Sequence, residues 1–206
     1  MSRRYDDVTR DLQRIYDSVV DQRARSEVEP WKQAERTAYL ELLRREGRQT
    51  LLEIGAGTGV HGRFFADAGL EVVCTDLSSA MVEHCRAQGL VAYRQDLLHL
   101  DLDRAFDAAF AMNCLLHVPR EDFPAALSAI RSTLAAGGVF YLGQYGGIVR
   151  DGIWEGDSYV PPRYFSFLTD TELLDFARER FEVESFNAVD VGFDDGTYFQ
   201  SLLLRA

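Results

Sequence analysis

Apolar residues in the first fifty positions recur three and four apart, which is the spacing of one helix face. This pattern predicts a helix from Tyr5 to Val19. A polar stretch then interrupts it, and Pro30 suits the first turn of a second helix that ends at Gly47. Residues 1–47 are therefore expected to form an N-terminal helical cap.

Beyond residue 48, short apolar runs alternate with helical stretches. The five runs are Thr50–Ile54, Glu71–Thr75, Leu90–Arg94, Phe106–Met112 and Val139–Leu142. Turn and capping residues, such as Gly69 and either Ser78 or Ser79, separate the runs from the helices. Strands that alternate with helices predict parallel β-α-β units, with helices on both faces of one sheet.

The C-terminal part of the chain has a different pattern. Thr169–Glu172 is a capping box that begins a helix, and two strand-like runs follow at about 181–191 and 198–204. The turn signal Asp194–Gly196 lies between them and favours an antiparallel hairpin. The sequence thus predicts an α/β fold, a Rossmann-like seven-stranded and mostly parallel sheet with an antiparallel C-terminal hairpin.

Length and composition fit a single domain over residues 1–206, with residues 48–206 as its core. The sequence has no run of about eighteen apolar residues and no signal-peptide pattern, so we expect no membrane span. The three cysteines form no C-x-x-C pair. We therefore expect reduced thiols, a cytoplasmic location and no metal site.

The balance of charges limits the possible partners. The formal net charge is −11, and Lys32 is the only lysine. Proteins bind nucleic acid mostly by neutralising phosphates with lysine and arginine. A chain this acidic is a poor candidate for nucleic-acid binding, so a small molecule is the expected partner.

The first predicted strand is followed by a glycine-rich turn, Gly55–Gly59, of the kind in which backbone amides approach a ligand closely. Gly57, Gly59 and Gly62 also spell G-x-G-x-x-G, and Asp76 lies about twenty residues further on, as in dinucleotide-binding folds. The turn alone therefore leaves two cofactors open.

Three features favour S-adenosylmethionine over a dinucleotide. Glu53 precedes the first glycine, where a carboxylate suits a cationic amino group and sulfonium and repels a pyrophosphate. The glycines begin at Gly55, so two residues stand between the strand and Gly57. Asp96 follows the third strand, where it is placed to accept a hydrogen bond from an adenine amino group.

At these positions the sequence resembles the class I S-adenosylmethionine-dependent methyltransferases, over about residues 48–206. The matching segments are Leu52–Gly59, Cys74–Ser78, Gln95–Leu97, Phe106–Phe110 and Leu134–Gly138, with the terminal hairpin. Their order along the chain carries the resemblance, because each acid taken singly can be a turn or cap residue.

The resemblance implies where the cofactor binds. Glu53 and the glycines would hold its methionine part, Asp76 its ribose and Asp96 its adenine. The full set of cofactor-binding residues expected on this basis is Glu53, Gly55, Ala56, Gly57, Gly59, Asp76, Leu77, Met81, Asp96, Leu97 and Asn113, the last near the sulfonium.

Methyl transfer requires alignment of the acceptor, exclusion of water, and a base only where the acceptor carries a proton. His117 follows the fourth strand, at the edge where cofactor and acceptor should meet, and it is the candidate base. The alternative is that His117 packs or hydrogen-bonds at the start of the next helix.

Residues 143–168 lack clear periodicity and hold many aromatic side chains, as substrate-covering segments do. Tyr145 and Trp154, with Tyr16 from the N-terminal helix, are expected to form an aromatic pocket. Arg163 would hold a substrate carboxylate or phosphate. The alternatives are that the aromatics cover the sheet edge and that Arg163 pairs with a nearby acid.

The sequence therefore predicts an enzyme that transfers a methyl group from S-adenosylmethionine to an O, N or C atom of a small organic molecule. A regulatory protein that binds the cofactor without turnover is one alternative. An NAD(P)-dependent oxidoreductase on the related fold is another. A methyltransferase for RNA or protein is disfavoured by the net charge and by the lack of an added recognition domain.

Overall fold

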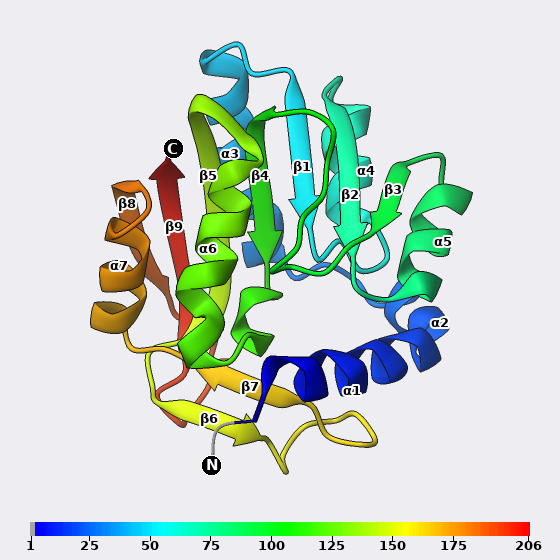
Figure 1. The fold of residues 1–206 in the computed structure, drawn as a ribbon, viewed down its shortest axis with the longest axis vertical. Helices are drawn as coiled ribbons and strands as arrows, with labels where there is room; N and C mark the ends of the chain where they lie inside the picture. The colour runs from blue at the N-terminus through cyan, green and yellow to red at the C-terminus, as the bar shows by residue number, and fades with distance from the viewer. Residues whose placement is uncertain (1–2) are drawn as a thin grey trace.

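The computed structural model describes residues 3–206, and its centre is one seven-stranded sheet (Figure 1). The strands stand in the order β3-β2-β1-β4-β5-β9-β8. Neighbouring strands pair in parallel except at β9, which is antiparallel to both β5 and β8. The strands of this sheet are β1 (Thr50–Ile54), β2 (Glu71–Asp76), β3 (Val91–Arg94), β4 (Phe106–Met112), β5 (Leu134–Gly146), β8 (Glu182–Val189) and β9 (Tyr198–Arg205).

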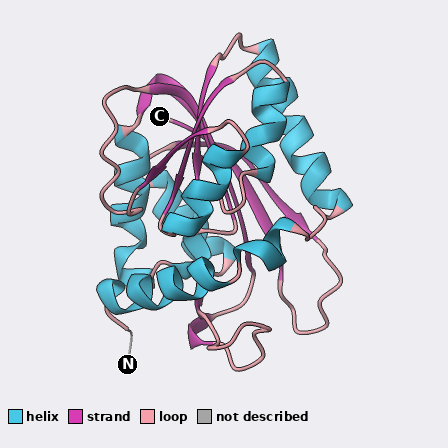
Figure 2. Ribbon diagram, turned by 90° about the vertical axis from the view of Figure 1, so that its right-hand side faces the viewer, coloured by secondary structure: helices cyan, strands magenta, loops and turns pink. Residues whose placement is uncertain are grey.

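Helices cover both faces of the twisted sheet, as Figure 2 shows from the side. One hydrophobic core lies under α6 and α7, and a second lies under α3, α4 and α5. The helices are α1 (Tyr5–Ser18), α2 (Val20–Ala24), α3 (Pro30–Arg45), α4 (Val60–Asp67), α5 (Ser79–Ala87), α6 (Phe123–Ser132) and α7 (Asp170–Arg178), with the short 3-10 turns Leu115–His117 and Arg120–Asp122. The expected α/β fold with helices on both faces is confirmed.

The strand register brings the predicted motifs to one edge of the sheet. Ile54, the last residue of β1, is paired with Thr75 of β2 and with Ala111 of β4. Because these three strands are parallel, the segments that follow them leave the sheet at the same edge. The glycine turn, Asp76 and Asn113 therefore lie close together, although they are far apart in sequence.

Two further elements lie across this edge (Figure 1). The amphipathic helix α1 packs Val8 and Leu12 against Tyr164 of a two-stranded sheet formed by β6 (Arg150–Ile153) and β7 (Tyr164–Phe167). At its C-terminal end, α1 places Asp17 where the Ser78 hydroxyl donates to its carboxylate at 2.5 Å. The N-terminal helix thus covers the carboxyl ends of the strands.

Three local predictions were wrong. The segment 143–168 is not irregular, because β5 continues to Gly146 and a β6–β7 hairpin follows. The polar stretch before Pro30 contains the short helix α2. The strand expected at Val139–Leu142 begins earlier, because β5 starts at Leu134.

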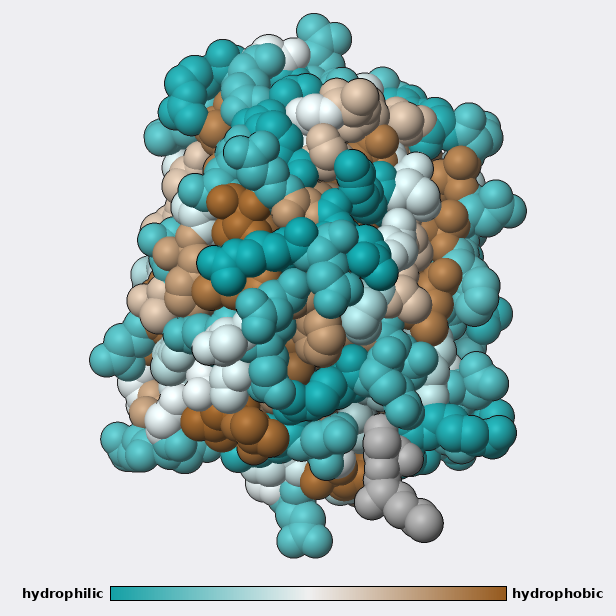
Figure 3. Space-filling view, turned by 60° about the vertical axis from the view of Figure 1, so that its left-hand side comes forward, coloured by the Kyte–Doolittle hydropathy of each residue, from teal (hydrophilic) through white to brown (hydrophobic). Residues whose placement is uncertain are grey.

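The surface of the molecule is mainly polar. Apolar residues occur in small groups among polar ones on the face that Figure 3 shows. Within residues 3–206, no helix has the length and apolar character required to cross a membrane.

Candidate functional site

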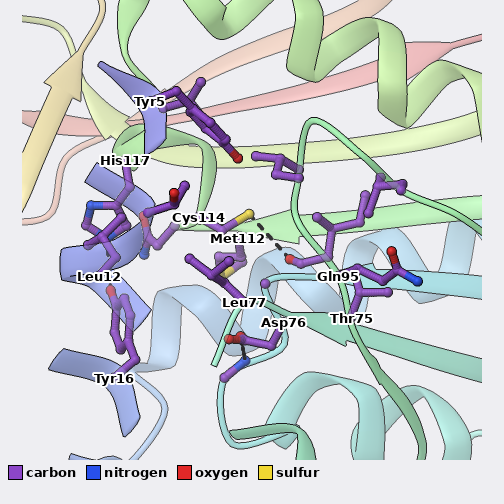
Figure 4. A pocket seen from close by; sticks show the side chains of 18 of the residues that line it. Tyr5, Leu12, Tyr16, Thr75, Asp76, Leu77, Gln95, Met112, Cys114 and His117 are labelled. Atoms are coloured by element: carbon purple, nitrogen blue, oxygen red, sulfur yellow. Dashed lines mark hydrogen bonds between the residues drawn. The ribbon is translucent and has the colours of Figure 1, made fainter. Parts of the chain in front are cut away.

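A cavity of about 860 Å³, partly open to solvent, lies between the strand ends and α1 (Figure 4). From the sheet side it is lined by Ile54, Gly55, Gly57, Thr75, Asp76, Leu77, Gln95, Leu97, Leu100, Met112, Asn113, Cys114, His117 and Val118. From α1 and α2 it is lined by Tyr5, Thr9, Leu12, Tyr16 and Arg23. Six of the eleven cofactor residues expected from sequence thus line one cavity, namely Gly55, Gly57, Asp76, Leu77, Leu97 and Asn113.

The glycine turn has the backbone conformation that its sequence suggests. Gly55, Gly57 and Gly59 all have positive φ, between 55° and 76°. A Cβ on Gly55 would lie 2.4 Å from the Cβ of Cys114, so this position has no room for a side chain. Ala56 does not line the cavity, because it is buried and its N–H donates to the Thr75 carbonyl at 2.9 Å. Gly59 is also outside the lining, where it precedes α4.

Asp76 connects the end of β2 to the glycine turn. Its carboxylate accepts the N–H of Gly57 at 2.8 Å and the N–H of Ser78 at 2.8 Å. Burial raises the pKa of this carboxyl group, while these two backbone N–H groups oppose the change. Asp76 therefore faces the cavity from a fixed position. Met81 does not, because it is fully buried in the protein core.

Glu53 lies beneath the glycine turn instead of in the lining of the cavity. The Cys74 thiol donates to its Oε2 at 3.3 Å, and a Cβ on Gly62 would come within 2.4 Å of the same atom. Burial raises the pKa of Glu53 to about 8, although nearby Arg36 opposes this shift. In this structure Glu53 supports the turn from behind, and its predicted contact with the cofactor stays a prediction.

Asp96 also lies outside the main cavity. The Tyr5 hydroxyl donates to its Oδ1 at 2.9 Å, and the Leu98 N–H donates to the same oxygen at 2.8 Å. The adjacent residues Gln95 and Leu97 reach the cavity, while Asp96 lines a shallower cleft beside it. Both bonds go to Oδ1, and the predicted contact of Asp96 with adenine stays a prediction.

Asn113 follows β4 and is the one non-glycine residue with positive φ in residues 3–206, at 57°. Its N–H donates to the Gly143 carbonyl at 2.7 Å. Its side-chain oxygen is buried without a hydrogen-bond partner. A buried acceptor without a partner is costly, and a ligand N–H or cationic group at this point would satisfy it.

Arg36 and His61 form a second group of unsatisfied polar atoms, which the sequence analysis missed. Nε and Nη1 of Arg36 and Nδ1 of His61 are buried without hydrogen-bond partners. Burial lowers the pKa of His61 to about 3, and the positive charge of Arg36 adds to this shift. The same charge lowers the pKa of Glu53. No motif marks these positions, because Arg36 reaches them from the middle of α3.

These unsatisfied atoms fit S-adenosylmethionine. Its methionine part carries an ammonium group and a carboxylate, which need acceptors and donors respectively. The Asn113 oxygen is an unused acceptor beside the turn, and the Arg36 guanidinium has unused donors behind it. The Asn113 acceptor lines the cavity, whereas the unused donors of Arg36 lie outside its lining.

Tyr16 and His117 lie together on one side of the cavity, with Thr75 and Gln95 on the other (Figure 4). The Tyr16 hydroxyl is 2.9 Å from Nε2 of His117, and Nδ1 of His117 is 2.7 Å from the Tyr164 carbonyl oxygen. Because a carbonyl can only accept, Nδ1 carries the hydrogen, and Nε2 accepts the hydrogen of Tyr16. Burial, with Arg163 adding to it, lowers the pKa of His117 to about 3. Both ring nitrogens of His117 therefore make hydrogen bonds within the protein, and neither is free to contact the methyl acceptor.

Arg163 stands behind Tyr16 and does not line the cavity. Its guanidinium binds the buried carboxylate of Asp157 at 2.7 and 2.8 Å, and it donates to the Tyr16 hydroxyl at 2.9 Å. The alternative of an ion pair with a nearby acid is what the structure contains, and the predicted contact of Arg163 with a substrate anion stays a prediction.

Tyr145 and Trp154 also lie outside the cavity lining. Tyr145 packs edge-on against Trp31 and Phe199, on the face covered by α3. Trp154 packs against Phe165, with a guanidinium of β6 above its ring. These aromatics cover the end of the sheet, so of the five expected substrate residues only Tyr16 and His117 reach the cavity.

The cavity residues from the N-terminal helices were mostly missed. Thr9, Leu12 and Arg23 line it together with Tyr5 and Tyr16. The signal was present in the sequence, because four of these positions follow the three- and four-residue spacing of a single helix face. Helical spacing does not reveal which ligand or sheet edge such a face covers.

Comparison with known families identifies part of the chain. Residues 51–138 match the family model of the methyltransferase domain. This segment runs from β1 to the start of β5 and includes the glycine turn, Asp76 and Asn113. No curated protein matches the chain in sequence.

Several solved structures have the same fold over nearly the whole chain. The 1,6-didemethyltoxoflavin N1-methyltransferase of Burkholderia thailandensis, solved with S-adenosylhomocysteine, has a TM-score of 0.75 at 20% identity, covering 98% of this chain and 90% of that one. The magnesium protoporphyrin IX methyltransferase of Synechocystis PCC 6803 has a TM-score of 0.73 at 17% identity, with coverages of 96% and 98%. The cyclase SpnF has a TM-score of 0.71 at 18% identity and covers 96% of each chain.

At these identities the likeness shows a shared fold, and the family model carries the identification. Both agree with the resemblance found in the sequence and with the predicted cofactor. Residues 51–138 match a methyltransferase domain, and nearly the whole chain has the fold of a methyltransferase solved with S-adenosylhomocysteine.

Proposed function

We propose that this protein is an S-adenosylmethionine-dependent methyltransferase that modifies a small organic molecule. The observation that carries the proposal is the single cavity that joins the two halves of such a site. Gly55, Gly57 and Asp76, which would hold the cofactor, line the same cavity as Tyr16 and His117. Cofactor and acceptor would therefore meet in one enclosed space.

The way in which the cavity is covered supports a small acceptor. Helix α1 lies across the strand ends and is held there by the bonds from Tyr5 to Asp96 and from Ser78 to Asp17. The cavity combines apolar walls, such as Leu12 and Met112, with a few polar groups, such as Asp76 and Asn113, as small-molecule sites do. The formal net charge of −11 does not favour a polyanionic substrate.

The protein itself would position the cofactor and the methyl acceptor and would exclude water from them. The cofactor, when bound, supplies a methyl group that its sulfonium already activates. Asp76 and the glycine turn would hold the cofactor, and Asn113 would accept a hydrogen bond beside it. The apolar side chains of Leu12, Met112 and others exclude water from the reacting atoms.

The experiment is methyl transfer from radiolabelled S-adenosylmethionine to a panel of phenols, heteroaromatic N–H compounds and amines. We expect stoichiometric formation of S-adenosylhomocysteine and labelled product with at least one acceptor class. Cofactor binding with no transfer to any of them would favour the regulatory alternative. Hydride transfer from a reduced dinucleotide would favour the oxidoreductase.

A further inference from the structure

We infer that the Tyr16 hydroxyl contacts the methyl acceptor and passes its proton to His117, and that the acceptor is a neutral molecule with an O–H or ring N–H. This inference rests on the proposed function and names the acceptor class for the same cavity. It also changes the role expected of His117, which acts through Tyr16 instead of touching the acceptor.

The hydrogen bonds around Tyr16 leave one position open. Its hydroxyl hydrogen points to Nε2 of His117, and one lone pair accepts a hydrogen from Arg163 at 2.9 Å. A phenol oxygen can accept a further hydrogen bond. Since Tyr16 lines the cavity and Arg163 does not, the remaining lone pair is available to an O–H or N–H within the cavity.

A continuous path for a proton leads away from that position. It runs from the acceptor to the Tyr16 oxygen, from Tyr16 to Nε2 of His117, and it ends where Nδ1 donates to the Tyr164 carbonyl at 2.7 Å. That last bond fixes the tautomer in which Nε2 is unprotonated. His117 is therefore ready to receive a proton, in spite of being buried.

The balance of the step is as follows. As the bond between the acceptor atom and the methyl carbon forms, the carbon–sulfur bond breaks, and its electron pair stays on sulfur. The acceptor's proton moves to Tyr16 while the Tyr16 proton moves to His117. The hydrogen on the acceptor's oxygen or nitrogen becomes strongly acidic while that atom gains the methyl group. Even a weak base such as His117 is therefore sufficient at this moment.

The charges near Tyr16 disfavour an ammonium acceptor. Arg163 donates to the Tyr16 oxygen, and Arg23 lies over the Tyr16 ring at 5.7 Å and lines the cavity. Arg163 forms an ion pair with the Asp157 carboxylate. Arg23 forms no ion pair with an acid in residues 3–206. Because Asp157 neutralises Arg163, Arg23 is the guanidinium whose charge would repel a cationic amine beside Tyr16.

Three naphthalene probes test the inference by binding, in the presence of saturating S-adenosylhomocysteine. They are 2-naphthol, which offers an O–H; 2-methoxynaphthalene, which does not; and 2-naphthylmethylamine, which is an ammonium ion. We expect 2-naphthol to bind at least tenfold more tightly than either of the others. Tyr16→Phe should abolish its advantage over 2-methoxynaphthalene, and the control Tyr93→Phe, at an exposed tyrosine of β3, should not.

A spectroscopic measurement separates the proton path from a merely structural role of His117. In ¹⁵N-histidine-labelled protein, 2-naphthol should shift the Nε2 resonance of His117, and this response should vanish in Tyr16→Phe. Calorimetric binding of S-adenosylhomocysteine reports on the proposed function alone. If that binding is intact, the inference is overturned by absence of 2-naphthol binding, by preference for the ammonium probe, or by an unchanged preference in Tyr16→Phe.

Discussion

The carboxylate of Asp76 accepts the backbone N–H of Gly57 at 2.8 Å, which ties the end of β2 to the turn that follows β1. The bond spans 19 positions of sequence and fixes the conformation of the turn at the floor of the cavity. A second N–H, from Ser78, holds the other carboxylate oxygen. The same residue thus shapes the turn and presents its carboxylate to a ligand.

Replacement of Asp76 should therefore weaken cofactor binding. We expect Asp76→Ala to reduce affinity for S-adenosylmethionine at least tenfold, which corresponds to about 1.4 kcal/mol. Asp175→Ala, at an exposed acid of α7, is the matched control. Isothermal titration calorimetry measures both, with circular dichroism to verify folding. Unchanged affinity in a folded Asp76→Ala protein would remove Asp76 from the cofactor site.

Glu53 should make the protein less stable as the pH rises. Its pKa in the folded protein is about 8, above the ordinary value of 4.5, so the folded state binds more protons than the unfolded state between these values. The free energy of unfolding therefore falls as pH rises through this range. The buried groups His61 and His117 have the opposite effect, but only between pH values of about 3 and 6.5.

Between about pH 6.5 and pH 8, Glu53 therefore changes the free energy of unfolding with pH, whereas the two histidines do not. Urea unfolding at several pH values in this window should show a loss of stability with rising pH in the wild type. In Glu53→Gln the slope should be much smaller. An equal slope in the two proteins would mean that Glu53 is ionised in the folded state throughout.

Tyr39 should contribute to stability through its hydroxyl group. This buried hydroxyl lies 2.9 Å from the carbonyl oxygens of Ala109 and Val139, on neighbouring strands β4 and β5. Tyr39→Phe leaves these carbonyls without that donor, so a loss of about 1–3 kcal/mol is expected. Urea unfolding measures it, with Tyr93→Phe as an exposed control. A loss as small as that of the control would contradict the bonding described.

Tyr5 should govern how tightly α1 covers the cavity. Its hydroxyl donates to Asp96 at 2.9 Å, and no other residue of α1 bonds to that carboxylate. Tyr5→Phe should speed amide hydrogen exchange within Tyr5–Ser18 by up to about tenfold, because one hydrogen bond is worth about 1 kcal/mol. Exchange in β4 should not change. Equal exchange in α1 of both proteins would show that Asp96 does not hold the helix.

The sequence was sufficient for the fold and for the glycine turn because both depend on local patterns. Apolar runs that alternate with helices specify parallel strands, and the spacing of Gly55, Gly57 and Gly59 reflects backbone conformations that other residues adopt with strain. Asp76 could be found for the same reason, since it stands at the end of a recognisable strand.

The acceptor end of the cavity could not be predicted to the same extent. Tyr16 and His117 are 101 positions apart, and their bond depends on how α1 lies across the sheet. Strand β7 buries residues on both of its faces, including Tyr164 and Phe165, so its sequence lacks the alternation of a half-exposed strand. Arg163 and Trp154 accordingly looked available to a substrate, whereas tertiary contacts occupy them.

We expect the cavity to bind S-adenosylmethionine and not a dinucleotide. Calorimetric titration of the purified protein with S-adenosylmethionine, S-adenosylhomocysteine and reduced NAD tests it most directly. We predict saturable binding of the first two compounds and none of the third. Tight binding of reduced NAD with no response to either sulfur compound would contradict the account.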